Sequence, residues 1–168
     1  MNLKLITAVY QAYNKAGPGQ EWHPLLGFDG SITTFCNLAV NLVCNAIGYT
    51  KFNAGGVDQP VTANSMFTLM NRETGDWLSI PGDVAQAHAN SGALVLAAQM
   101  VAGAHGHVCV IIPSEMMDSA HYQKKVPVVM NVGKDVFIGK PVSYAFRAEP
   151  TYFVLKETVP DGRIPNGS

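Results

Sequence analysis

Residues 103–112 read Gly103-Ala104-His105-Gly106-His107-Val108-Cys109-Val110-Ile111-Ile112. After the glycine-rich start, the segment becomes apolar and rich in β-branched residues, which is typical of a buried strand. Alternation along that strand predicts one face with His107, Cys109 and Ile111, and an opposite face with Val108, Val110 and Ile112. A histidine at the start of a buried strand is held in place, as a general base must be. Gly106 leaves room for another backbone or a substrate to come close.

A second informative segment is Thr34-Phe35-Cys36-Asn37, which begins an apolar helix. We expect this helix to run to about Ile47 and to stop at Gly48. Its polar residues are spaced by four, which predicts a buried helix with one narrow polar stripe; they are Asn37, Asn41 and Asn45. The candidate N-caps are Ser31, Thr33 and Thr34. Cys36 would then lie in the first turn, where unpaired N–H groups and the helix dipole favour a thiolate.

The rest of the chain predicts helices first and strands afterwards. The expected helices cover residues 2–15, a short segment capped by Thr62 or Asn64, and a segment from Pro81-Gly82-Asp83 to about Asn90. Residues 17–33 and 49–61 are expected to be loops. The expected strands are 93–101, 107–112, 126–132, 144–148 and 152–156. This order predicts an α+β fold in which a central Cys-bearing helix packs on an antiparallel sheet of about five strands. We expect one domain over residues 1–157 and a flexible tail over 158–168.

Composition narrows the class of protein. The chain has 168 residues, 48% of them hydrophobic and 14% charged, with a net charge of −1. These values suit one globular domain with a real core. Without a basic cluster, neither nucleic acid nor an anionic membrane is expected as a partner. The N-terminal apolar run is short and lacks a cleavage site, so we expect synthesis in the cytoplasm without a signal peptide.

The three cysteines are expected to be free thiols. Cys36 and Cys44 would be about 12 Å apart along one helix, too far for a disulfide. We expect Cys44 and Cys109 to be small buried hydrophobes. No metal or other cofactor is expected, because paired ligand motifs and a phosphate-binding loop with lysine are absent from the sequence. His105, His107 and Cys109 would need a distant fourth ligand to bind zinc.

The chemistry that remains is that of a thiol hydrolase. Cys36 is the candidate nucleophile, His107 the candidate base, and Asn131 the candidate third residue that orients the imidazole. Asn131 stands in the neighbouring predicted strand, and its amide oxygen can accept from the ring N–H. The sequence leaves three alternatives open for the third role, all in the loop between these strands: Glu115, Asp118 and His121.

Three further residues are candidates for substrate binding. His105 shares the parity of His107, and it could instead be the true base or a simple loop residue. Trp77 and Trp22 are candidates for the walls of a cleft, although packing would explain both equally well.

The two motifs resemble those of the NlpC-like and CHAP-type cysteine peptidases and amidases. Thr34-Phe35-Cys36-Asn37 is similar to their nucleophile segment, and Gly106-His107-Val108-Cys109-Val110-Ile111 to their histidine strand. The stretch Ala85–Gly92 is also similar to wall hydrolases of phages and secreted antibacterial effectors. The resemblance implies a papain-like fold and hydrolysis of amide bonds in peptidoglycan stem peptides or cross-bridges. Many such enzymes have His or Glu as third residue, so the amide of Asn131 is a departure.

This resemblance also implies partners and a place of action. We expect delivery to the wall of a target cell through a holin-like pore or a secretion machine, and in the second case a cognate inhibitor that plugs the Cys36 groove. Two other functions remain open: a transferase or deamidase acting on protein side chains, and a non-catalytic module that binds the wall. The sequence does not indicate which peptidoglycan bond is cut or the oligomeric state.

Overall fold

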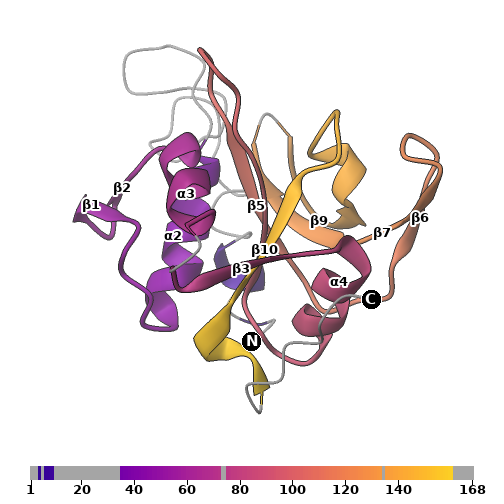
Figure 1. Ribbon diagram of the computed structural model, residues 1–168, viewed down its shortest axis with the longest axis horizontal. Helices are drawn as coiled ribbons and strands as arrows, with labels where there is room; N and C mark the ends of the chain where they lie inside the picture. The colour runs from indigo at the N-terminus through magenta and orange to yellow at the C-terminus, as the bar shows by residue number, and fades with distance from the viewer. Residues whose placement is uncertain (1–3, 5, 10–34, 73–74, 134, 161–168) are drawn as a thin grey trace.

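The protein is described by a computed structural model that covers residues 4, 6–9, 35–72, 75–133 and 135–160 (Figure 1). Residue 4 and residues 6–9 are helical. The longer helices are α2 (Cys36–Ala46), α3 (Ala63–Met70) and α4 (Gly82–Asn90), and two 3-10 turns follow, η1 (Val142–Tyr144) and η2 (Lys156–Thr158). The strands are β1 (Asn53–Gly56), β2 (Gln59–Pro60), β3 (Trp77–Ile80), β4 (Val95–Gln99), β5 (His107–Ile111), β6 (Met117–Ser119), β7 (Lys124–Val126), β8 (Val128–Val132), β9 (Val136–Pro141) and β10 (Thr151–Leu155).

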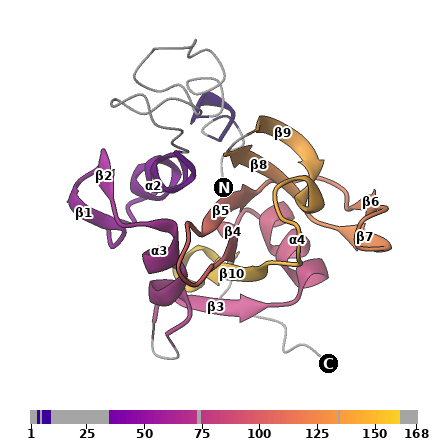
Figure 2. The same cartoon turned by 90° about the horizontal axis from the view of Figure 1, so that it is seen from above.

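The architecture is α+β, as the sequence predicts, with a main sheet in which every neighbouring pair is antiparallel. The strand order is β3-β10-β4-β5-β8-β9. Helices α2 and α3 lie on one side of this sheet and α4 on the other (Figure 2). Among the described residues, the helices are too short or too polar to cross a membrane.

The expected number of about five strands is not confirmed, because the main sheet has six in the described part of the chain. The sequence did not predict two of these strands, β3 and β9. Residues 144–148 do not form the expected strand. There, the carbonyl of Val142 accepts from the N–H of Ala145 at 2.9 Å and of Phe146 at 3.2 Å. These bonds close a turn, although the alternating large side chains of Tyr144 and Phe146 imitate the period of a strand.

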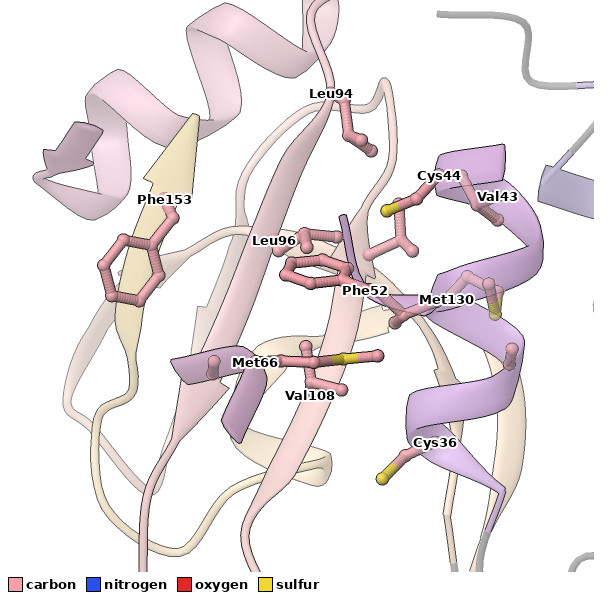
Figure 3. Close-up of a cluster of buried hydrophobic side chains, with 14 of the residues drawn as sticks. Cys36, Val43, Cys44, Phe52, Met66, Leu94, Leu96, Val108, Met130 and Phe153 are labelled. Carbon is pink, nitrogen blue, oxygen red and sulfur yellow. The ribbon is translucent and has the colours of Figure 1, made fainter. Parts of the chain in front are cut away.

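The sheet separates two apolar clusters, and the alternation predicted for β5 is confirmed. Val108, Val110 and Ile112 belong to the cluster beneath α2 and α3. Cys109 and Ile111 belong to the cluster beneath α4. Figure 3 shows the first cluster, in which Phe52, Met66 and Leu96 fill the space between α2 and the strands. Burial of this cluster is what fixes α2 against the sheet.

Helix α2 carries the predicted polar stripe, and that stripe holds a hairpin. The side chain of Asn41 donates to Asn53 Oδ1 and to the carbonyl of Val57, both at 2.8 Å. Asn45 and Asn53 also exchange hydrogen bonds through their amides at 3.0 Å. Residues 49–61 therefore include the hairpin β1–β2 rather than only the expected loop. The helix ends as predicted at Gly48, which has a φ of 93°.

Both shorter helices also begin where the sequence predicts. Thr62 is the N-cap of α3 and accepts a hydrogen bond from the N–H of Ser65 at 3.2 Å. Helix α4 follows Pro81 and is closed by Ser91. At the far end of the chain, the hydroxyl of Thr158 accepts from the N–H of Leu94 at 2.8 Å. The rest of the expected tail, residues 161–168, lies outside the described residues.

Candidate active site

Cys36 is the first residue of α2 and faces the sheet. Its side chain is 4% exposed, and in Figure 3 its sulfur points toward the strand that carries Val108. The N-cap is Phe35, which makes no side-chain capping bond. The N–H groups of the first turn therefore remain available to the sulfur, and the N–H of Asn37 is one that contacts it. The caps expected at Ser31, Thr33 and Thr34 lie outside the described residues.

His107 begins β5 and reaches the Cys36 thiol. The two side chains are within hydrogen-bonding distance of each other. The residue before it, Gly106, is tightly enclosed, because a Cβ there would lie 2.8 Å from the carbonyl oxygen of Gln99 and would strike the side chain of Asn64. Asn64 in turn donates to the carbonyls of Val101 at 3.2 Å and Ala104 at 2.9 Å. The close approach expected at Gly106 is thus made by the protein itself, and it fixes the backbone that leads into His107.

Asn131 in β8 fixes the other side of the imidazole. Its Oδ1 lies 2.6 Å from Nε2 of His107, and its Nδ2 donates to the carbonyl of Asp135 at 2.6 Å. Because a carbonyl only accepts, the second bond determines which end of the amide faces His107. The acceptor Oδ1 therefore takes the proton of Nε2, which leaves Nδ1 of the neutral ring as the base that faces the thiol.

The three side chains meet where β5 and β8 stop pairing. The paired residues are Val110 with Met130 and Ile111 with Val129. Extending this antiparallel register places His107 opposite Gly133, but the ladder does not continue that far. The N–H of Val108 is instead directed at the sulfur of Cys36. The end of α2 thus occupies the place where the two strands separate.

The electrostatics of the pair favour charge separation. Burial alone would raise the pKa of the Cys36 thiol, but the hydrogen bond and charge of His107, together with the N–H groups of Val108 and Asn37, lower it below its ordinary value. Burial lowers the pKa of His107, and the bonds to Cys36 and Asn131 outweigh that effect and raise it. The arrangement therefore favours a thiolate beside an imidazolium, which is the reactive form of a catalytic cysteine.

The sequence did not predict two residues that contact His107 at this site. Gly133 lies against the imidazole, and a Cβ there would be 3.0 Å from Cε1 of His107. Phe146 packs on the ring of His107 with centroids 5.0 Å apart and planes at 55°. A glycine just after a strand and an aromatic residue in a turn are common signals, and neither by itself indicates a contact with a distant histidine.

The other candidates lie apart from this centre. Trp77 was expected at a cleft, but it is a core residue, 2% exposed, whose Nε1 donates to the hydroxyl of Tyr49 at 2.8 Å. Its ring is stacked on Phe52, so packing accounts for it. His105 is exposed in the loop before β5, and Trp22 lies outside the described residues.

The three alternatives for the third role are exposed side chains. Asp118 pairs with Lys125 at 3.7 Å, and the ring N–H of His121 donates to the carbonyl of Arg147 at 2.5 Å. Of the candidates for this role, Asn131 is the one with a hydrogen bond to His107.

All three cysteines are free and buried. Burial raises the pKa of Cys44 and of Cys109, so only Cys36 has a favoured thiolate. Within the described part of the chain, His, Cys, Asp and Glu side chains do not gather in groups of three that could hold a metal ion.

No protein-family model matches this chain, and no curated protein shows a significant match to it.

Proposed function

We propose that the protein is a cysteine hydrolase that cleaves amide bonds, with Cys36 as nucleophile, His107 as base and acid, and Asn131 as the residue that orients the imidazole. The observation that carries this proposal is the continuous chain of contacts from the thiol through His107 to the amide of Asn131. A thiol, an imidazole beside it and a hydrogen-bond acceptor for the imidazole are the groups that a cysteine hydrolase uses, and these contacts support the proposal.

The reaction would begin with attack of the Cys36 sulfur on the carbonyl carbon of the amide. The resulting oxyanion requires donors, and the backbone N–H of Cys36 at the start of α2 would supply one of them. His107 would then give its proton to the departing amine, the C–N bond would break, and a thioester would remain. Water attacks that thioester while His107 takes up a proton, and the carboxylic acid leaves with Cys36 as thiolate again.

The substrate class follows from the resemblance of the two motifs rather than from the geometry. We propose peptidoglycan, with the cut in a stem peptide or cross-bridge. On this proposal the protein acts at the wall of a target cell after delivery through a secretion machine or a holin-like pore. A cognate inhibitor that covers the Cys36 groove would protect the producing cell.

The test is release of peptide fragments from purified peptidoglycan, followed by mass spectrometry. Wild-type protein should release fragments, and Cys36→Ala should not. The matched control is Cys44→Ala, which makes the same substitution on the same helix but away from the imidazole. Circular dichroism of both variants establishes that the fold is intact. Equal activity of Cys36→Ala and wild type would refute the proposal.

The same preparation separates the other two functions. If wall fragments are not released, proteins and an amine donor are added, and ammonia or new isopeptide links would indicate a transferase or deamidase. Sedimentation with the wall that survives alkylation of Cys36, with no covalent chemistry, would indicate a binding module instead.

A further inference from the structure

The imidazole of His107 is enclosed on more sides than a hydrogen-bonded pair requires. Asn131 holds Nε2, and Gly133 lies against Cε1. The ring of Phe146 covers the imidazole at a centroid distance of 5.0 Å, and Phe146 is itself buried. With a hydrogen bond at one edge, a backbone at another and an aromatic ring over it, the imidazole has little freedom to turn.

Phe146 stands in a turn, and its position depends on a separate element, the hairpin β6–β7. The hydroxyl of Tyr122, between the two strands of that hairpin, donates to the carbonyl of Phe146 at 2.8 Å. The backbone N–H of Tyr122 is bound by the hydroxyl of Ser119 at 3.1 Å. Two neighbouring contacts support the same segment: His121 donates to the carbonyl of Arg147, and Lys124 pairs with Glu149 at 2.7 Å.

We propose that Phe146 is a positioning residue for the His107 imidazole, and that the hairpin β6–β7 controls this position through the hydroxyl of Tyr122. This inference rests on the proposed thiol chemistry, and it extends the functional unit from the three polar residues to a hairpin that carries none of them.

Two physical effects make Phe146 more than packing. An imidazole held at one edge can still turn about that bond, and a base displaced by a fraction of an ångström no longer faces the sulfur. An aromatic ring against His107 also covers part of the imidazole, and a hydrogen bond in less polar surroundings is electrostatically stronger. Loss of either effect would weaken the charge separation between Cys36 and His107.

The hydroxyl of Tyr122 is a dependable donor for this purpose. Burial, with a smaller contribution from the charge of Glu149, raises the pKa of Tyr122 to about 12. The charge that acts on His107 is that of the Cys36 thiolate. The same charge acts on Cys109, which lies on the strand of His107. Across the working pH range, the bond from Tyr122 to Phe146 therefore does not titrate, and a changed pH profile reports on the imidazole.

The experiment measures the rate of iodoacetamide reaction at Cys36 against pH, by mass spectrometry on the folded protein. It compares wild type with Phe146→Leu, which keeps an apolar side chain but removes the ring, and with Tyr122→Phe, which removes only the hydroxyl. The matched control is Tyr49→Phe, which deletes the hydroxyl bound by Trp77 in the core. Tyr49 lies beyond the opposite end of α2 from Cys36, so the dyad should not sense its loss.

We expect Phe146→Leu to lower the reaction rate at pH 6 about tenfold and to shift the apparent pKa of Cys36 toward that of an ordinary cysteine, because a misplacement of about 1 Å costs about 100-fold. Tyr122→Phe should lower the rate in the same way by about threefold, because it removes the hydrogen bond to Phe146 but leaves the aromatic ring in place. Tyr49→Phe should leave the pH profile unchanged, whatever it does to the urea midpoint.

Two results would overturn the inference, and they are distinguishable. If wild type shows a low apparent pKa and both Phe146→Leu and Tyr122→Phe keep its pH profile, the positioning role is wrong while the proposed function stands. If the wild-type thiol is itself ordinary, the proposed function and the inference fail together.

Discussion

Gly133→Ala tests how closely the backbone of the sheet is fitted to the imidazole. The new methyl carbon would lie 3.0 Å from Cε1 of His107 and 3.4 Å from Nδ2 of Asn131. Favourable carbon–carbon contacts begin at about 3.5 Å, so the ring must retreat by about 0.5 Å. Phe146 limits that retreat on the ring face. Since a displacement of about 1 Å costs about 100-fold, half of it should cost about tenfold in the reactivity of Cys36.

Stability should change far less than reactivity. Gly133 is not among the glycines with positive φ, so alanine is compatible with its backbone and should gain about 0.4–1 kcal/mol through the unfolded chain. Overpacking opposes this gain by about 1–3 kcal/mol. The net loss in the free energy of unfolding should therefore stay below about 2.6 kcal/mol, which urea denaturation can measure.

The assay is again alkylation of Cys36 against pH, and Gly56→Ala is the control. A Cβ at Gly56 would also meet an atom at 3.0 Å, but that atom is Oδ1 of Asp58, the flexible end of an exposed side chain. Gly56→Ala should keep the wild-type profile. If Gly133→Ala does so as well, the backbone at Gly133 does not confine the imidazole of His107.

Three further predictions concern Asn131, His88 and the two other cysteines. Asn131→Ala removes the acceptor of Nε2 and the donor to Asp135, and it should lower Cys36 reactivity at pH 6 and cost about 1–3 kcal/mol in urea denaturation; an unchanged pH profile would exclude an orienting role. Burial lowers the pKa of His88, so the unfolded chain binds the proton more readily than the folded one, and the free energy of unfolding should fall as pH drops below about 6.5. The free energy of unfolding of His88→Leu should fall less steeply between pH 7 and 5, and a slope equal to that of wild type would contradict this. Cys44 and Cys109, with raised pKa values and side chains at most 1% exposed, should resist iodoacetamide until urea unfolds the chain. Labelling of either one at the rate of Cys36 in native protein would be inconsistent with the structure.

Much of the fold could be predicted from local features of the sequence. Thr62 and Gly48 mark helix ends through chemistry that needs no partner beyond a few residues away, and the strand beginning at His107 has an alternation that two opposite cores then use. The sequence also supplied the three residues that meet at the site, because a thiol at a helix start and an imidazole at a strand start are local features whose chemistry can be recognised without a tertiary contact.

What the sequence did not supply depends on tertiary contact. Strand β9 was missed because Gly139 has a φ of 81° and the strand ends at Pro141, so its pattern is broken although its backbone pairs with β8. Trp77 stands beside a turn and looks exposed, yet the hydroxyl of Tyr49 allows its indole to be buried. Phe146 acquires its role only when the chain brings it against His107.

The apolar clusters on the two faces of the sheet both contribute to the site, so the site depends on the folding of both layers. Cys36 belongs to the cluster under α2, whereas His107 takes its neighbour Phe146 from the opposite side of the sheet. The complete arrangement of thiol, imidazole and aromatic ring therefore needs packing on both faces of the sheet. While the chain is being synthesised or is unfolded, Cys36 has the pKa of an ordinary cysteine, about 8.5. On the proposed function, an incompletely folded chain would therefore lack the reactive thiolate.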